Sequence, residues 1–443
     1  MASTSIYRTM GTATNRNIFT LSMWVKMSKT GSDLSAYQFC DFYVSADIRI
    51  SIYHDPNDHL NCYMKGGGYD GNIFVTNAKY RDTSAWYHFV WRFDTTQATA
   101  SDRVRLYVNG ELATFSSTNY PSQNFNLQQG TSSYQQFIGK YGANTDNNFE
   151  GLMSHIHFCD GQSYAPTVFG ETDSTTGEWK IKTDVTATYG NNGFFILKDG
   201  NSVTDHSGNG LSFSTAGTLT KTEDCPSNVF ATGNNLATYW TAATFANGNT
   251  TQTTQSNNYA FNTSTLGFKT GKFYWEAKIV SSAQSDMFGI TGRTNAGATT
   301  HELGKYSDQY AFNSYSGVSR NNSTDTSYAS QFNSNGTIVQ IAVDMTNLKI
   351  HLGVNGVWQN SSNPSNNTGG LAIGAISTTT DGYYFVGIGD YSNGAGTYSY
   401  NFGNGYFGTT AVSSAGTNAS GNGIFEYDTP TGYTALSTKG LNQ

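Results

Sequence analysis

Apolar and polar side chains alternate with a period of two over several short stretches of this 443-residue chain. Because neighbouring side chains of a strand point to opposite faces of a sheet, this period predicts β-strands. The clearest examples in the first half are residues 18–26, 86–94, 103–108 and 151–158. The third of these ends in Asn109-Gly110, and Asn-Gly is a strong hairpin signal because both residues tolerate positive φ.

The second half of the chain repeats this arrangement with different residues. Residues 273–280, 339–345 and 350–354 alternate in the same way, and Asn355-Gly356 follows the last of them as another hairpin signal. No residue-level identity relates the two halves. The pattern therefore indicates two antiparallel domains of similar architecture rather than a duplication.

These strands predict an all-β fold with two antiparallel β-sandwich domains. The first domain is expected at residues 1–170 and the second at 236–408. Between them, residues 171–235 predict a connecting segment with short strands. Residues 409–443 predict a Gly/Ser/Ala/Thr-rich linker and a C-terminal segment.

The composition narrows the class of protein further. Charged residues make up 12% of the chain, where an average soluble domain has roughly 25%. Aromatic residues reach 14%, and 48 glycines occur. This composition argues against a coiled coil, a disordered chain and a transmembrane helix. The net charge of −7 argues against nucleic-acid binding, which needs a basic surface.

The N-terminal residues lack the apolar stretch of a secretory signal. The four cysteines are widely spaced and form no Cys-x-x-Cys motif; they are Cys40, Cys62, Cys159 and Cys225. We expect reduced thiols in a protein made in a cytoplasm.

Three stretches of the first domain carry a resemblance to the laminin-G-like, concanavalin-like fold. They are Phe19-Thr-Leu-Ser-Met-Trp24-Val25, Ala85-Trp-Tyr-His-Phe-Val90 with Arg105-Leu-Tyr-Val-Asn-Gly110, and Phe137-Ile-Gly139 with Phe149-Glu-Gly-Leu-Met153. The second domain resembles a SPRY-type sandwich. That resemblance is carried by Gly271-Lys-Phe-Tyr-Trp275-Glu276, Met287-Phe-Gly-Ile290, Ile341-Ala-Val-Asp344, Val354-Asn-Gly-Val-Trp358 and Tyr400-Asn-Phe-Gly403.

The connecting motifs resemble those of a family of tailed-bacteriophage virion proteins, common in marine phages, that join the two modules. The motifs are Phe169-Gly-Glu-Thr-Asp173, Tyr189-Gly-Asn-Asn-Gly-Phe194, Asp205-His-Ser-Gly-Asn-Gly210 and Cys225-Pro-Ser-Asn-Val-Phe-Ala231. The resemblance implies a structural protein on the virion surface, made in the host cytoplasm. Its implied partners are other virion proteins and identical copies, as a trimer in a tail fibre, with neither nucleic acid nor membrane insertion.

His155, His157 and Cys159 share one face of the strand predicted at 151–158, with Leu152, Ile156 and Phe158 on the core face. Two histidines two residues apart with a third donor can bind zinc. A polar outer face, or one covered by a neighbouring domain or subunit, explains the same histidines without a metal.

Asp55, Asn57 and Asp58 lie in an oxygen-rich loop, and Asp146-Asn147-Asn148 forms a second one. Calcium takes six to eight such oxygen ligands, and the laminin-G-like resemblance implies calcium at a rim. Asp-Pro-Asn-Asp between strands is equally good turn chemistry. We therefore expect no cofactor, with calcium as the alternative at Asp55, Asn57 and Asp58.

Glycoside hydrolysis requires two carboxyl groups about 5 to 9 Å apart across the scissile bond. Glu150 and Glu276 are isolated acids in strands, and Glu171 and Asp173 fall in a loop. The sequence predicts no catalytic residue.

The abundant Tyr and Asn suit glycan binding, which uses aromatic platforms with planar amides or acids. They suit protein recognition too, and no individual binding residue stands out. The sequence predicts a non-enzymatic tail fibre or adhesin that binds a host surface glycan. The alternatives are a capsid-decorating knob or cement protein and, third, a polysaccharide-degrading enzyme.

Overall fold

A computed structural model of the chain describes residues 4–31, 37–127, 133–142, 148–200, 202–238, 243–255, 259–294, 301–391 and 394–442. The chain divides into two compact units, Met1–Lys221 and Thr222–Gln443. The boundary lies inside the stretch 171–235 that the sequence predicts as a connector.

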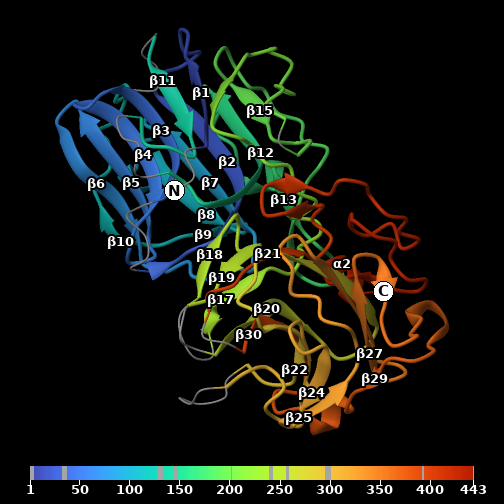
Figure 1. Cartoon of the computed structure of the whole chain (residues 1–443). Helices are drawn as coiled ribbons and strands as arrows, with labels where there is room; N and C mark the ends of the chain where they lie inside the picture. Colours follow the sequence, from blue (N-terminus) through green and yellow to red (C-terminus); the bar gives the residue numbers. More distant parts are fainter. Residues whose placement is uncertain are drawn as a thin grey trace. The chain divides into compact units, whose positions relative to one another are not determined.

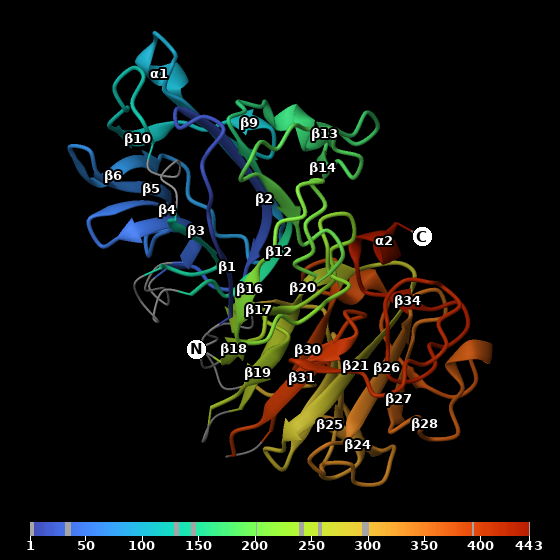
Figure 2. The ribbon, with the colours of Figure 1, turned by 90° about the horizontal axis from the view of Figure 1, so that it is seen from above.

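The first unit is a sandwich of two antiparallel sheets that face each other across an apolar core (Figures 1 and 2). The eight-stranded sheet has the order β10 (Phe115–Thr118), β6 (Tyr69–Thr76), β5 (Leu60–Gly66), β4 (Ile48–His54), β3 (Tyr37–Ser45), β11 (Gln135–Ile138), β1 (Ser5–Thr9) and β16 (Ser214–Ala216). The six-stranded sheet has the order β15 (Phe194–Ile196), β12 (Gly151–Asp160), β2 (Ile18–Met27), β7 (Tyr87–Asp94), β8 (Val104–Val108) and β9 (Glu111–Leu112).

Aromatic side chains join the two sheets of this core. Phe19 of β2 stacks on Phe93 with a ring-centroid distance of 4.4 Å, and it contacts Phe42 of the opposite sheet at 5.3 Å. All three rings are fully buried. Burial of such rings is the main source of stability in a sandwich of this size.

Residues 163–192, here called the cover segment, pack on the outer face of the six-stranded sheet. They include the 3-10 turn η3 (Pro166–Val168) and the hairpin of β13 (Gly170–Thr172) and β14 (Trp179–Ile181). Phe169 and Tyr189 form an apolar cluster there with Val90, Cys159 and Phe195 of the sheet. Most of the expected connector therefore belongs to the first unit.

The second unit also contains two large antiparallel sheets around an apolar core. The seven-stranded sheet has the order β17 (Gly233–Thr238), β20 (Ala260–Phe268), β30 (Tyr384–Asp390), β22 (Asp286–Thr291), β23 (Gln309–Asn313), β24 (Val318–Asn321) and β25 (Thr324–Ser327). The nine-stranded sheet has the order β18 (Thr244–Ala246), β19 (Thr251–Thr253), β31 (Thr397–Asn401), β21 (Lys272–Ser281), β26 (Ile338–Asp344), β27 (Lys349–Val354) and β28 (Val357–Trp358), with β29 (Leu371–Ala372) on β27 and β34 (Thr434–Ala435) on β21. A small hairpin joins β32 (Tyr406–Phe407) and β33 (Thr410–Ala411).

Residues 412–442, here called the C-terminal segment, cover the outer face of this nine-stranded sheet and also supply its short strand β34. Phe425, Tyr433 and Ala435 cluster there with Tyr274 and Ala342 of the sheet. This segment falls within 409–443, expected as a linker and a C-terminal segment, and its two parts are joined because Thr417 donates from its backbone N–H and its hydroxyl to Asp428.

The carboxylate of Glu276 holds the C-terminal segment to the sheet. It accepts hydrogen bonds from the backbone N–H groups of Glu426 and Tyr427, both at 2.9 Å. The Tyr274 hydroxyl also donates to this carboxylate at 2.9 Å, and the Asn401 side-chain amide donates to it at 3.1 Å. Burial raises the pKa of Glu276 to about 7, and these donors act in the opposite direction.

The helical elements that the structure describes are short. They are α1 (Ala100–Arg103), α2 (Thr438–Leu441), and the 3-10 turns η3, η4 (Pro364–Asn366) and η5 (Ile376–Thr378). Among the described helices, none has the length and apolarity to cross a membrane.

The all-β fold class predicted from the sequence is confirmed. The two predicted hairpins are confirmed as well. Asn109 and Asn355 have φ of 49° and 46°, and the glycines after them have φ of 85°. Positive φ at both turn positions matches the right-handed twist of the flanking strands, which explains the Asn-Gly sequence.

We predict that Glu276→Ala destabilises the second unit by roughly 2–4 kcal/mol, because it leaves several buried donors without an acceptor. Calorimetric unfolding measures the change, and proteolysis of the C-terminal segment should become faster. Glu111→Ala, at an exposed strand end, is the control and should change stability by less than about 0.5 kcal/mol. Equal stability of the two variants would contradict the role given to Glu276.

Candidate functional site

The outer face of the eight-stranded sheet carries two cross-strand rows of aromatic and polar side chains. The strand register buries one row in the core, which consists of Ile6, Ile138, Cys40, Ile52, Cys62 and Phe74. Alternation then turns the neighbouring rows outward. One outer row contains Tyr7, Phe137, Asp41, Ser51, Tyr63 and Asn72, and the next contains Thr9, Gln135, Tyr43, Arg49, Lys65 and Asp70.

Arg49 lies at the centre of this face between two tyrosine rings. Its guanidinium carbon is 4.6 Å from the ring centroid of Tyr63 and 4.6 Å from that of Tyr141. Tyr43 makes an edge contact with Tyr141, and the Tyr7 ring stacks on Phe137 at 5.7 Å. Such cation–π and aromatic contacts hold the side chains in fixed orientations. Apart from the buried Phe137, these side chains remain partly exposed.

Polar groups on the same face are oriented by hydrogen bonds. The Tyr63 hydroxyl donates to Asp70 and the Tyr53 hydroxyl donates to Asn72, both at 2.7 Å. Asp41 is buried and accepts from the Ser51 hydroxyl at 2.7 Å. Burial raises the pKa of Asp41 to about 6, against the effect of its hydrogen bonds and of Arg49.

Residues 140–142 approach this face closely. The backbone N–H of Gly142 donates to the Asp41 carboxylate at 2.8 Å. A Cβ at Gly142 would come within 2.7 Å of the Tyr43 ring and 2.9 Å of Phe137. Glycine is therefore required where this loop passes the aromatic side chains.

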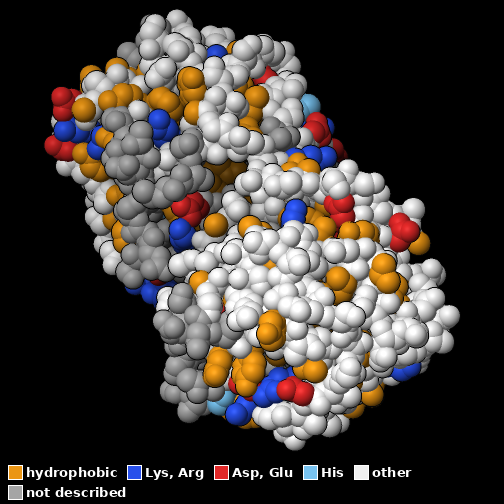
Figure 3. All heavy atoms as spheres, in the orientation of Figure 1, with side chains coloured by type: hydrophobic (Ala, Val, Ile, Leu, Met, Phe, Trp, Pro, Cys, Tyr) orange, Lys and Arg blue, Asp and Glu red, His pale blue; other side chains and the backbone are white. Residues whose placement is uncertain are grey.

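The space-filling view is dominated by uncharged polar side chains and backbone, with few charged groups (Figure 3). Hydrophobic side chains, which include tyrosine in its colours, gather with some charged ones in the part of the view where Figure 1 labels β3 to β6. This agrees with the low charge of the sequence.

The outer face of the six-stranded sheet, by contrast, is closed by the cover segment. The indole N–H of Trp179 donates to Nδ1 of His88 at 3.0 Å, and the other ring nitrogen of His88 contacts the Ser22 hydroxyl at 2.8 Å. His88 also stacks on Trp24 at 4.7 Å. Burial lowers the pKa of His88 to about 3.

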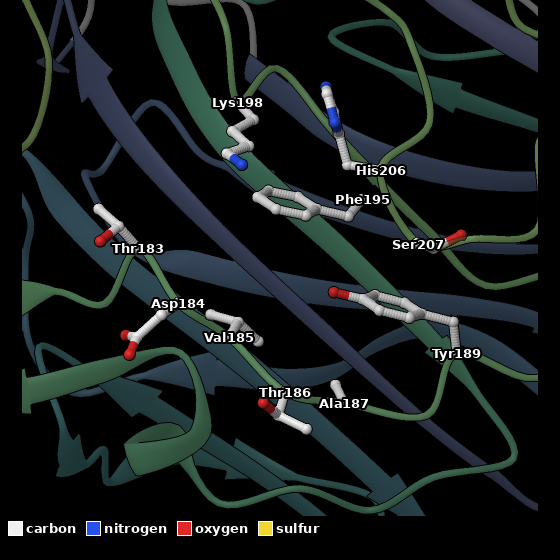
Figure 4. A pocket seen from close by; sticks show the side chains of 10 residues that line it. All are labelled: Thr183, Asp184, Val185, Thr186, Ala187, Tyr189, Phe195, Lys198, His206 and Ser207. Atoms are coloured by element: carbon white, nitrogen blue, oxygen red, sulfur yellow. The ribbon is translucent and has the colours of Figure 1, made fainter.

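A hollow of about 440 Å³ opens in this cover (Figure 4). Figure 4 shows the Tyr189 hydroxyl pointing inward between the stretch 183–187 and the side chains of Phe195, Lys198 and His206. Two of its polar groups already have partners: Tyr189 bonds His157 at 2.8 Å, and His206 lies 3.2 Å from Asp199.

The structure does not place the three side chains proposed for zinc in one regular strand row. A β-bulge between Ser154 and His157 interrupts the alternation of β12, and His155 within it has φ of 47°. His157 and Cys159 instead pack under the cover segment, where His157 stacks on Phe195 at 3.9 Å. Burial raises the pKa of the Cys159 thiol.

The prediction that these three residues share one regular face is therefore wrong. The prediction that Leu152, Ile156 and Phe158 form the core face opposite them is wrong as well. The bulge inserts one residue, so Met153 packs against the core before it while Ile156 and Phe158 do so after it. In the described part of the chain, no group of three His, Cys, Asp or Glu side chains could hold a metal ion.

The residues proposed for calcium form the turn between β4 and β5. One Asp55 oxygen accepts from the backbone N–H groups of Asn57 and His59, both at 2.9 Å. Asp58 is ion-paired with Arg81 at 2.7 Å and accepts from the N–H of Gly31. Such contacts are typical of a hydrogen-bonded turn. In the second proposed loop, Asp146 and Asn147 lie outside the described residues.

The acids weighed for hydrolysis already have partners. Glu150 pairs with Lys29 at 2.7 Å, and Lys180 lies 3.4 Å from Glu171 and 3.1 Å from Asp173. Glu276 is fully buried under the C-terminal segment.

Sequence reasoning did not find the outer face of the eight-stranded sheet. Its signal was present in β4 and β5, where Arg49, Ser51 and Tyr53 alternate with isoleucines and Tyr63 and Lys65 alternate with sulfur-containing residues. The alternation predicts which side chains point outward, but not which strands lie side by side.

A known protein family is similar to the first module. Residues 3–168 match the Laminin_G_3 family model, described as the concanavalin A-like lectin/glucanases superfamily. The laminin-G-like part of the sequence prediction is thus confirmed. No curated protein sequence matches the chain.

Solved SPRY domains are among the structures similar to this chain. The SPRY domain of human HERC1 matches with a TM-score of 0.29 and 16% identity, covering 38% of this chain and 96% of that one. A human SPRY domain matches with a TM-score of 0.26 and 16% identity, covering 34% and 90%. Stonustoxin matches with a TM-score of 0.29 and 19% identity, covering 40% of this chain and 27% of that one.

We predict that the first unit loses stability as the pH falls from 7 to 4, in part through His88. Its pKa of about 3 in the folded protein lies below the usual 6.5 of an unfolded chain. The stabilisation is therefore complete above pH 6.5 and is lost as the pH falls toward 3. His88→Gln should lose less unfolding free energy over this range than the unmodified protein.

Ser22→Ala is the control, because it removes one partner of the ring but keeps the imidazole. Chemical denaturation at pH 7, 5.5 and 4 measures how the unfolding free energy changes with pH in each of the three proteins. Equal losses in His88→Gln and in the unmodified protein would refute the prediction.

Proposed function

We propose that this chain is a non-enzymatic protein of a tailed-bacteriophage particle, a tail fibre or adhesin-type component that binds a glycan on the host surface. The observation that carries the proposal is the outer face of the eight-stranded sheet, where Arg49, Tyr63 and Tyr141 form an ordered aromatic centre. The proposal assigns no catalytic residue and requires no cofactor.

The chemistry of this face suits sugars. The apolar C–H face of a pyranose packs on an aromatic ring, and sugar hydroxyls pair with amide and carboxylate groups. Tyr43, Tyr63 and Tyr141 offer rings, while Asn72 and Asp70 offer planar acceptors beside them. Preorganised side chains reduce the entropy lost on binding.

The virion context is supported by the resemblance of the connecting motifs to phage structural proteins. The partners proposed with it are other virion proteins and identical copies of the chain, as a trimer on the virion surface. The low charge of the chain suits close packing of such copies because it limits long-range repulsion.

The same low charge favours a second candidate, a capsid-decorating protein. Such a protein packs many identical copies against one another, and the mostly uncharged surface in Figure 3 is compatible with this. Hydrolysis of a polysaccharide is less favoured, because the acids weighed for it are bound to other groups of the protein.

We predict that the purified protein binds oligosaccharides and that Tyr63→Ala weakens this binding about tenfold, a change of roughly 1.4 kcal/mol. A glycan array followed by calorimetry measures it. Tyr315→Ala, at an exposed site in the second unit, is the control and should leave the affinity unchanged. Absence of binding to any glycan, or equal effects of the two changes, would contradict the proposal.

The two virion roles differ in copy number. A tail fibre predicts at most tens of copies per particle and blocking of host adsorption by the free protein, whereas a capsid decoration predicts hundreds of copies. Quantitative mass spectrometry of purified particles and an adsorption assay measure the two quantities. Hundreds of copies without blocking would replace the adhesin role by the decoration role.

A further inference from the structure

Arg49 forms no ion pair among the described residues, although its charge acts on the nearby carboxyl group of Asp41. Its guanidinium contacts two tyrosine rings, and its Nε is buried with no hydrogen-bond acceptor. The salt bridges of the described residues do not include it. An arginine beside aromatic rings keeps its charge, and its terminal N–H groups can bind a ligand.

The acids of this face are engaged elsewhere. Asp47 and Asp70 lie 2.9 Å and 4.0 Å from Lys65. Asp70 also accepts a hydrogen bond from the Tyr63 hydroxyl, and the buried carboxylate of Asp41 accepts one from the backbone N–H of Gly142. The positive charge of Arg49 is therefore not neutralised by a direct contact with any of them.

Another cation lies beside these rows, in addition to Arg49 and the ion-paired Lys65. The Lys140 ammonium is 5.8 Å from the ring centroid of Phe137, which stacks on Tyr7. The face thus combines two cations that make no ion pair among the described residues, Arg49 and Lys140, with rings that can carry sugars. Charge complementarity favours an anionic group beside a pyranose ring.

We propose that this face binds an acidic glycan, in which a sugar carboxylate pairs with the guanidinium of Arg49 while the pyranose rings pack on the neighbouring tyrosines. Arginine binds a carboxylate through two parallel N–H···O bonds, which fixes the orientation of the sugar as well as adding affinity. This inference rests on the proposed glycan-binding function and names the class of ligand.

The test compares pentagalacturonate, its fully methyl-esterified form and neutral cellopentaose as ligands of the intact protein. Esterification removes the charge and keeps the sugar backbone. We expect pentagalacturonate to bind at least tenfold more tightly than its ester, with an affinity that falls as salt is added.

Arg49→Gln should abolish this tenfold preference. Arg49→Lys should retain part of this preference, because an ammonium keeps the charge but lacks the paired N–H groups that bind both oxygens of a carboxylate. Arg105→Gln is the matched control, since it removes one positive charge from a partly exposed arginine on β8 of the same unit. It should leave the preference intact, and melting curves of all variants should coincide within a few degrees.

Equal binding of pentagalacturonate and its ester, or an unchanged preference in Arg49→Gln, would overturn this inference. Binding of cellopentaose that is weakened by Tyr63→Ala but not by Arg49→Gln would do the same while leaving the proposed function in place. If none of the three oligosaccharides binds, and no glycan binds in the array, both proposals fail.

Discussion

The strict alternation of side chains across an antiparallel sheet is the constraint on which the first unit depends. Once Ile6, Ile52 and Cys62 are buried, the register leaves Tyr63 and Arg49 no direction but outward. The core and the candidate site are therefore two faces of one pairing pattern. A shift of one residue would exchange them, so the apolar core also positions the polar face.

The outer faces of the large sheets are lined by similar residues, but they differ in whether another segment of the chain covers them. The cover segment closes the six-stranded sheet through His88 and Trp179, and the C-terminal segment closes the nine-stranded sheet through Glu276. In both places polar groups of the sheet are buried with partners supplied by the covering chain. On the eight-stranded sheet, Arg49 and its tyrosines keep part of their surface exposed.

The bulge in β12 shows how one residue changes the meaning of a sequence pattern. With regular alternation, His155, His157 and Cys159 would form one row, as a metal site needs. The extra residue at the bulge turns Met153 toward the core and breaks the row. The histidine at 157 then packs on Phe195 as an uncharged ring, because burial lowers its pKa well below the usual value.

The sequence by itself determined the all-β class, the Asn109-Gly110 and Asn355-Gly356 hairpins and the concanavalin-like first module. The fold class and the hairpins depend on side-chain period and turn conformation, which are local properties. The concanavalin-like module follows from the resemblance of its motifs to that fold. Only the tertiary structure decided that β1, β11, β3, β4 and β5 lie side by side and that Tyr141 reaches Arg49. Such pairings join residues up to about 130 positions apart, and they follow from the packing of the whole core rather than from any local pattern.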